Sequence, residues 1–211
     1  FVEGRKMSKS LGNFIRVREL LEEGHDPAAI RHLLISSHYR GELNFTRAGL
    51  KASGVAVQRL IDFEARLSQL ETTDSAEESE LPRLAEKVVS DFRSTMDDDF
   101  NSAGALGVLF GFVTKVNAEL DAKGNVSATD RDLALGALRS MDKVLGLLEV
   151  AQASRVIDDD LSSWVERMIE ERAEARASRD FARADEIREE LSAKNIVLED
   201  SAEGTRWKVV N

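Results

Sequence analysis

Two lysines three residues apart, Lys6 and Lys9, are spaced to act on a polyphosphate. They belong to the string Lys6-Met7-Ser8-Lys9-Ser10. Gly4 and Gly12 flank the string, and because glycine relaxes the backbone, the segment can move as a unit. Both ammonium groups could then stabilise charge on a departing pyrophosphate, with serine hydroxyls as further donors. The charges alone would favour a solvated basic loop without chemistry.

The five-residue string is the KMSKS signature of class I aminoacyl-tRNA synthetases, and its surroundings resemble the cysteinyl-tRNA synthetase family. Three further stretches carry this resemblance: residues 26–45, which begin Asp-Pro-Ala-Ala-Ile-Arg; residues 97–110, which begin Asp-Asp-Asp-Phe-Asn; and residues 179–207, which begin Arg-Asp-Phe-Ala-Arg. They follow the family's order and cover nearly the whole chain, so the resemblance is to the part of the family from the KMSKS loop onward.

The resemblance implies part of an enzyme that forms cysteinyl-adenylate from cysteine and ATP with magnesium, and then transfers the cysteinyl group to tRNA-Cys. It also implies that Lys9 and Lys6 are catalytic. The residues implied to contact ATP are Lys6, Met7, Ser8, Lys9 and Ser10. The family's zinc ligands are expected upstream of the KMSKS loop, outside this sequence. We therefore expect the 211 residues alone to bind no cofactor and to catalyse neither step.

Helical periodicity dominates the elements that must position these residues. Asp26 before Pro27 predicts a helix start, and a longer helix is predicted from about Thr46 to Leu70. The expected fold class is mainly α: a helical stem and an anticodon-binding bundle, followed by a small α+β domain with a short β-hairpin. The predicted regions are 1–18, the KMSKS loop at the end of a catalytic domain; 19–72, stem-contact helices; 73–80, an acidic linker; 81–150, a bundle resembling the DALR domain; and 151–211, an anticodon-recognition domain.

The last region changes pattern. Asp160 and Asp180 are each predicted to cap a helix, and Asn195 is predicted to end the second one. Two short β-type runs follow, residues 196–198 and 207–210, separated by a stretch with Gly204, which predicts a hairpin. Upstream, Asp97-Asp98-Asp99 lacks the spacing of a calcium loop and is predicted to be an acidic helix start.

Arginines spaced three or four residues apart predict a basic edge in the last region. They are Arg172, Arg176, Arg179 and Arg183. Neighbouring glutamates could pair with them and leave an ordinary solvated surface. The resemblance implies that the anticodon is read here, by Arg176 and Asp185 at its first base and by Arg188 and Asp200 at further bases. Trp207 fits either a stacking platform or the core, whereas Phe181 is expected in the core.

The formal charge of −10 argues against a general nucleic-acid binder, because sequence-independent affinity needs a basic surface. Residues 1–72 carry 11 basic and 9 acidic side chains, whereas residues 73–150 carry 8 and 15. Contacts with tRNA must therefore be local. No metal site is predicted, because the chain has no cysteine and its three histidines lack metal-ligand spacing. No membrane span is expected, and the family implies a cytoplasmic monomer.

Two alternatives remain open from the sequence. A related ligase of mycothiol synthesis shares the signature loop but loads cysteine onto an amino sugar, and it is expected to lack the anticodon module. The chain could also serve as a non-catalytic RNA-binding or scaffold piece. Residues 180–207 count against the first alternative, because they carry the resemblance to the anticodon module.

Overall fold

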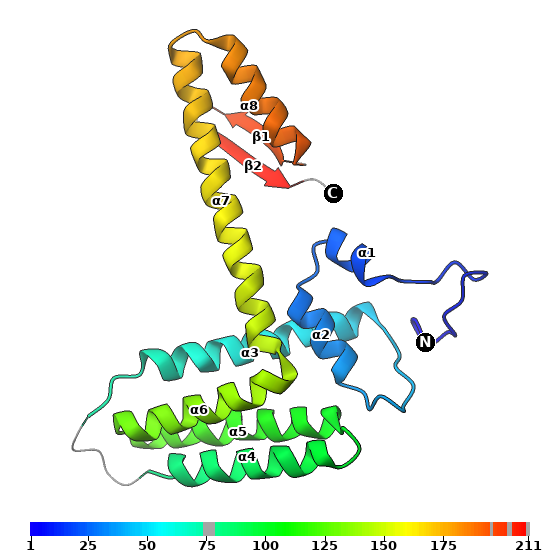
Figure 1. Ribbon diagram of the computed structural model, residues 1–211, viewed down its shortest axis with the longest axis vertical. Coiled ribbons are helices and arrows are strands. Elements are labelled where there is room, and N and C mark those ends of the chain that lie inside the picture. Colours follow the sequence, from blue (N-terminus) through cyan, green and yellow to red (C-terminus); the bar gives the residue numbers. More distant parts are fainter. Residues whose placement is uncertain (74–78, 195, 202–203, 210–211) are drawn as a thin grey trace. The chain divides into compact units, whose positions relative to one another are not determined.

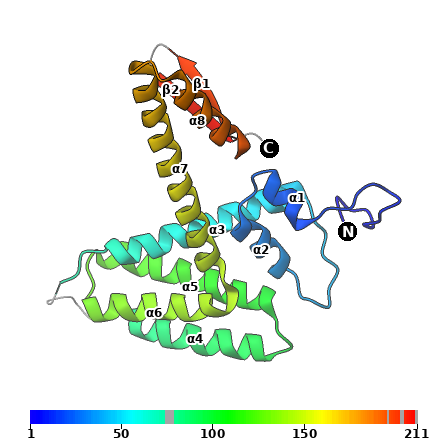
Figure 2. The same cartoon turned by 45° about the horizontal axis from the view of Figure 1, so that its top comes forward.

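The computed structural model describes residues 1–73, 79–194, 196–201 and 204–209, and of residues 156–159, 199–201, 204 and 206–209 it describes the backbone alone. Figure 1 and Figure 2 show these elements from two sides. The helices are α1 (Val17–Glu22), α2 (Pro27–Ile35), α3 (Arg47–Gln69), α4 (Leu81–Asp97), α5 (Ser102–Lys123), α6 (Ala128–Leu145), α7 (Leu147–Ala177) and α8 (Phe181–Ala193), and the strands are β1 (Ile196–Ser201) and β2 (Gly204–Val209). The prediction of a mainly α fold with one short hairpin is confirmed.

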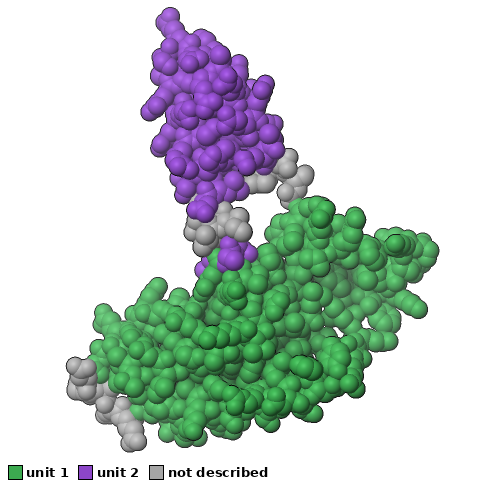
Figure 3. All heavy atoms as spheres, in the orientation of Figure 1, with its two compact units in different colours: residues 1–152 green, residues 153–211 purple. Residues whose placement is uncertain are grey.

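The chain forms two compact units, residues 1–152 and 153–211, which Figure 3 colours separately. Helix α7 belongs to both, because it begins in the first unit and ends in the second. Residues 74–78 of the predicted acidic linker lie outside the described residues, and α4 begins after them at Leu81. The predicted limits of the smaller regions stay predictions.

Side-chain caps start the helices that follow the KMSKS string. The Asp26 carboxylate accepts a hydrogen bond from the backbone N–H of Ala28 at 2.8 Å, with Pro27 in the first turn of α2. The Thr46 hydroxyl accepts from the N–H of Gly49 at 2.9 Å at the start of α3. Such caps satisfy backbone donors that a helix leaves unpaired at its N-terminus. Both predicted helix starts are confirmed.

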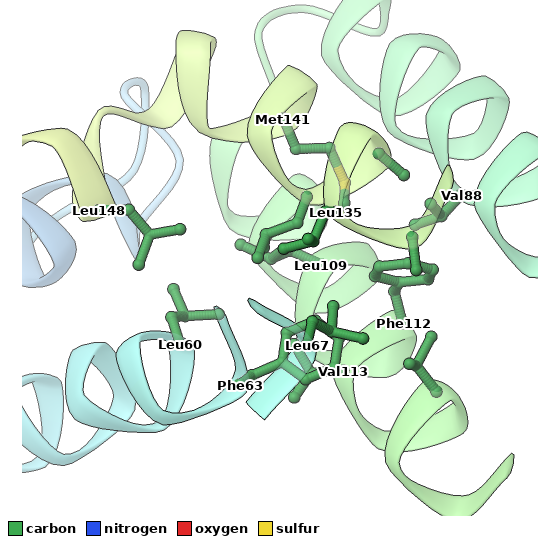
Figure 4. Close-up of a cluster of buried hydrophobic side chains, with 14 of the residues drawn as sticks. Leu60, Phe63, Leu67, Val88, Leu109, Phe112, Val113, Leu135, Met141 and Leu148 are labelled. Atoms are coloured by element: carbon green, nitrogen blue, oxygen red, sulfur yellow. The ribbon is translucent and has the colours of Figure 1, made fainter. Parts of the chain in front are cut away.

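Helices α3 to α6 and the first turn of α7 share the main hydrophobic core of the first unit. Figure 4 shows its side chains pointing toward one another: Leu60, Phe63 and Leu67 from α3, Val88 from α4, Leu109, Phe112 and Val113 from α5, Leu135 and Met141 from α6, and Leu148 from α7. Because protein interiors are closely packed, this core fixes the helices relative to one another.

Helix α5 is long and apolar enough to cross a membrane by length and composition alone. Its position accounts for that composition, since Ala105, Leu109, Val113 and Val116 are buried against the other bundle helices. A helix surrounded by neighbours is apolar on most of its faces. Among the described residues, no other helix meets the same criterion.

The prediction of an acidic helix start at Asp97-Asp98-Asp99 is wrong, because these residues end α4. The next helix, α5, is capped by Asn101, whose side chain accepts from the N–H of Gly104 at 2.8 Å. A long-range contact explains the acidic loop: the Tyr39 hydroxyl donates to Asp99 at 2.6 Å, and the Arg40 guanidinium lies 3.1 Å from the same carboxylate. These partners offset an unfavourable position near a helix C-terminus.

The predicted helix start at Asp160 is also wrong, because α7 runs without a break from Leu147 to Ala177. The sequence between these residues contains neither glycine nor proline, so nothing in it forces a break. The predicted cap at Asp180 is confirmed, since its carboxylate accepts from the N–H of Arg183 at 3.1 Å. Asn195, the predicted end of α8, lies outside the described residues.

The second unit has a small core of its own. It comprises Val165 and Met168 of α7, Ile187 and Leu191 of α8, and Ile196 of β1. Strands β1 and β2 pair antiparallel, with Ile196 opposite Val209 and Leu198 opposite Trp207. The helix pair and the hairpin therefore form one α+β module.

Candidate functional site

The KMSKS string follows residues 1–5, which are hydrogen-bonded to the residues just before α3. Val2 and Arg5 exchange backbone hydrogen bonds of 2.8 and 3.0 Å, which closes a tight turn. The N–H of Glu3 donates to the carbonyl of Phe45 at 2.8 Å, and the N–H of Gly4 donates to the Asn44 side chain at 2.9 Å. Val2 and Phe45 are buried in a small cluster of apolar residues, so the base of the loop is fixed.

Asn13 braces the loop from inside, a role that the sequence analysis missed. Its amide oxygen accepts from the N–H of Ser8 at 2.9 Å, and its amide nitrogen donates to the carbonyl of Lys6 at 3.1 Å. The Ser8 hydroxyl accepts from the N–H of Leu11 at 3.2 Å and lies 3.2 Å from the Ser10 hydroxyl. An asparagine side chain can donate and accept at once, which suits it to join two sides of a loop.

Lys6 and Lys9 lie on the surface of this braced loop. Both are exposed, and among the described residues neither ammonium group makes an ion pair or a side-chain hydrogen bond. Lys9 starts a turn, in which its carbonyl accepts from the N–H of Gly12 at 3.2 Å. Gly12 has φ of +64°, a left-handed conformation that glycine adopts readily. The structure therefore leaves both lysines exposed on one loop, with their charges available to an anion.

Two neighbouring arginines are occupied by structural pairs. The Arg16 guanidinium hydrogen-bonds Glu19 at 2.7 Å, and this bond lowers the pKa of the Glu19 carboxyl. The Arg47 guanidinium pairs with Glu23, with one contact of 3.0 Å, and lowers the pKa of that carboxyl in the same way. These exposed pairs tie α1 and α3 to their surroundings. They leave the lysines of the loop as cations that are available to a ligand.

Three of the predicted anticodon residues lie exposed on the second unit, namely Arg176 near the end of α7 and Asp185 and Arg188 on α8. Asp185 and Arg188 are three residues apart on one helix and so are neighbours on its surface. Within the described part of the chain, neither makes an ion pair or a side-chain hydrogen bond. Of Asp200 and Trp207 the structure describes the backbone alone, in β1 and β2, so their roles stay predictions.

Arg183 differs from the rest of the predicted basic edge. Its guanidinium hydrogen-bonds Glu171 of α7 at 2.9 Å and Glu186 of α8 at 3.1 Å, and these contacts raise the pKa of Arg183. The bond to Glu171 fastens α7 to α8 across the turn between them. For this arginine the expectation of pairing with neighbouring glutamates is confirmed.

The expectation that Phe181 lies in the core is wrong. Its side chain is 62% exposed at the first position of α8, directly after the cap Asp180. The face of α8 that packs on the second unit's core carries Ala184, Ile187 and Leu191 instead. Phe181 therefore offers a free aromatic face near the end of α7.

His32 packs inside the first unit and supports the fold. His32 Nδ1 lies 3.0 Å from the Ser53 hydroxyl, and its ring meets Phe110 edge-on with 5.9 Å between centroids. Burial lowers the pKa of His32 because it disfavours the charged imidazolium. Among the residues that the structure describes, no group of three or more His, Cys, Asp or Glu side chains could hold a metal ion.

Comparison with known families assigns three segments of the chain. Residues 1–54 match the family described as tRNA synthetases class I (C) catalytic domain. Residues 91–149 match the DALR domain, and residues 158–207 match the Cysteinyl-tRNA ligase anticodon binding domain. The three matches follow one another along the chain without overlap, and together they span both units.

Individual relatives of this chain are named cysteine–tRNA ligases. A cysteine–tRNA ligase of Solibacter usitatus is 40% identical over 98% of this chain, which covers 43% of that relative. Those of Geobacter sulfurreducens and Oceanobacillus iheyensis are 38% and 37% identical, with 46% and 44% of their lengths covered. The chain thus spans less than half the length of these relatives. With the KMSKS loop, the bundle and the anticodon-binding match in the same order, this chain belongs to the cysteinyl-tRNA synthetase family.

Proposed function

We propose that these residues supply the ATP-contacting loop and the tRNA-reading module of a cysteine–tRNA ligase. In the reaction, the cysteine carboxylate attacks the α-phosphate of ATP, which gives cysteinyl-adenylate and pyrophosphate. The terminal ribose hydroxyl of tRNA-Cys then takes the cysteinyl group and releases AMP. The observation that carries the proposal is the pair of exposed lysines, Lys6 and Lys9, on a loop braced by Asn13.

Lys9 would stabilise the negative charge that builds on pyrophosphate as it leaves, with Lys6 in support. This charge is greatest in the transition state, so a lysine aimed at it accelerates the reaction more than it strengthens ATP binding. The Ser8 and Ser10 hydroxyls would shape the loop and donate to phosphate oxygens. Their 3.2 Å separation allows both to face one ligand.

The second unit would read the anticodon of tRNA-Cys. Asp185 and Arg188 offer an acceptor and a set of donors side by side on α8, and Arg176 adds further donors at the end of α7. Such groups match the hydrogen-bonding edges of unstacked bases. The exposed ring of Phe181 would support a base by stacking.

The same proposal extends to the cofactors, the oligomeric state and the cell location. ATP would arrive with magnesium. A zinc ion would need ligands from outside these residues, because the chain has no cysteine and its described side chains form no metal-binding group. We infer a monomer in the cytoplasm. A ligase that loads an amino sugar would have no use for the anticodon-binding segment 158–207, which argues against that alternative.

Cysteine-dependent exchange of pyrophosphate into ATP tests the role of the loop. In a full-length ligase carrying this segment, Lys9→Ala should slow exchange about a hundredfold, the effect of about 3 kcal/mol of lost transition-state stabilisation. The affinity for tRNA should be nearly unchanged in a filter-binding titration. Lys51→Ala, at an exposed lysine of α3, is the matched control and should leave exchange intact.

An unaltered exchange rate in Lys9→Ala would reduce the loop to a basic surface. Residues 1–211 alone should show no exchange above a blank without protein, because the loop acts on a nucleotide that other elements must hold in line. Exchange by the 211 residues themselves would contradict that part of the proposal.

A further inference from the structure

A single residue joins helices α6 and α7. α6 ends at Leu145 and α7 begins at Leu147, with Gly146 between them at φ of +64° and ψ of +32°. The N–H of Gly146 donates to the carbonyl of Asp142 at 2.6 Å, which closes the last turn of α6. Because the connection is this short, the groups that hold the first turn of α7 fix where that turn lies on the bundle.

Asp142 holds that first turn. Its carboxylate accepts backbone N–H groups from three successive residues, Leu147 at 2.8 Å, Leu148 at 2.9 Å and Glu149 at 3.1 Å. Among the described residues it is the one buried acidic side chain, at 8% exposure. A helix N-terminus presents unpaired N–H groups and a positive dipole end, and a buried carboxylate satisfies both. Asp142 therefore caps the N-terminus of α7 in place of Gly146, which precedes the helix but has no side chain.

Arg31 contacts the corner between α6 and α7, that is, Leu145, Gly146 and Leu147, from the side of α6. It comes from α2, 114 residues before its partner in the sequence, and its Nε donates to the carbonyl of Leu145, the last residue of α6. Its guanidinium also lies flat against Gly146, since a Cβ there would be 3.2 Å from Nε and 3.3 Å from Cζ. A methyl group at position 146 would therefore shift the guanidinium by a few tenths of an ångström, and it would also strain a backbone held at φ of +64°.

Apolar packing completes the corner. Leu147, Leu148 and Ala151 are buried, and in Figure 4 Leu148 points toward Leu60 of α3. The first turn of α7 is thus held directly by the Asp142 carboxylate and by the hydrophobic core. Arg31 holds it indirectly, because it binds the last residue of α6. Arg31 lies in the segment that matches a catalytic domain, whereas α7 continues into the segment that matches an anticodon-binding domain.

We propose that Arg31 is a positioning residue that couples anticodon reading to the transfer of cysteine onto tRNA. The inference rests on the proposed function. A ligase gains rate from a remote contact when its framework delivers that contact's binding energy to the reacting end of the substrate. Loss of the Arg31 bond would loosen the joint between the end of α6 and the first turn of α7, through which the chain continues into the second unit. The anticodon would still bind, but a correct anticodon would no longer speed the transfer.

The test compares Arg31→Met with Arg66→Met in a full-length ligase carrying this segment. Arg66 is the matched control, because it also joins two helices of the first unit: its guanidinium donates to Asn117 at 2.7 Å and to Asp121 at 2.5 Å. Three quantities are measured: pyrophosphate exchange, the dissociation constants of two tRNAs, and the single-turnover rates of cysteine transfer to them. One tRNA carries the GCA anticodon, and the other differs in the first anticodon base.

In Arg31→Met we expect the ratio of transfer rates between the two tRNAs to fall about tenfold, the scale of one charge-assisted hydrogen bond. The ratio of dissociation constants and the exchange rate should stay at wild-type values. Arg66→Met should leave all three unchanged. If Arg31→Met does not fold, Arg31→Lys keeps the positive charge and the apolar stem but lacks the Nε–H that donates to the carbonyl of Leu145, and it should produce the same loss.

A wild-type ratio of transfer rates in a folded Arg31→Met would overturn the inference. So would a loss of discrimination that Arg66→Met shares, because the cause would then be general loosening of the bundle. Failure of the proposed function looks different: the unmodified ligase itself would then transfer cysteine to both tRNAs at one rate.

Discussion

The sharpest test of the loop's structure is the Asn13 side chain, which joins Lys6 to Ser8 through two hydrogen bonds. Asn13→Ala removes the bond accepted from the N–H of Ser8 at 2.9 Å and the bond donated to the carbonyl of Lys6 at 3.1 Å. Each neutral hydrogen bond contributes about 0.5–1.5 kcal/mol net. Because the side chain is half-buried and water can replace part of the loss, we take a total of about 1.4 kcal/mol. That free energy corresponds to about a tenfold change in rate.

The assay is cysteine-dependent pyrophosphate exchange at varied ATP concentration. We expect Asn13→Ala to lower kcat about tenfold and to change the KM for ATP little, because under the proposed function the brace orients lysines that would act mainly on the departing pyrophosphate. Asn13→Asp keeps an acceptor for the N–H of Ser8 but faces the carbonyl of Lys6 with a second oxygen, so it should lose at least as much. Asn125→Ala, in the exposed loop after α5, is the control and should behave as wild type.

A wild-type kcat in Asn13→Ala would refute the view that this brace prepares the loop. A fall in thermal stability as large as that of a core substitution would also refute this view, because it would show that Asn13 supports the fold and not only the loop. Full activity of Asn13→Asp combined with loss in Asn13→Ala would show that the contact with Lys6 contributes nothing.

Three further predictions concern two residues of the anticodon module and a half-buried histidine. Asp185→Ala should lower transfer to tRNA with the GCA anticodon by about 1–3 kcal/mol in transition-state terms and leave pyrophosphate exchange untouched, because base-edge contacts have that magnitude; wild-type transfer in this variant would contradict base reading. Phe181→Ala should weaken tRNA binding without loss of thermal stability, and wild-type binding in this variant would contradict stacking on its ring. For His32, burial lowers the pKa of the folded state, so the unfolded state binds more protons: stability is full above the unfolded pKa of about 6.5 and falls as the pH drops below it. Urea unfolding at pH 7.5 and 5.5 should show a smaller pH effect in His32→Gln than in His25→Gln, and identical effects in the two variants would assign the dependence elsewhere.

Local signals made much of the fold predictable. Asp26, Thr46 and Asp180 each cap a helix where the sequence indicated, because a cap depends on a side chain and the backbone two or three residues away. The lysine pair was equally visible, since its chemistry lies within five residues. Each of these features is decided by neighbours in the sequence.

The predictions for Asp99 and Phe181 failed because residues far away in the sequence decide where these side chains lie. Asp99 could be placed only with knowledge of Tyr39 and Arg40, some 60 residues away, which hold its carboxylate. Phe181 is exposed because α8 docks through a different face, and that choice depends on α7 and β1. Asn13 resembles any loop asparagine until both sides of the loop are seen to meet it.

The surface of α8 bears on how a chain with a net charge of −10 can select an RNA. Glu186 and Glu190 hold Arg183, and Glu171 of α7 competes for the same guanidinium, so this cation is neutralised locally. A phosphate backbone laid along this face would meet carboxylates, which repel it. Under the proposed function, Asp185 and Arg188 would instead meet the edges of individual bases. A module of this kind makes few phosphate contacts, and its affinity should depend weakly on salt and strongly on which bases reach it.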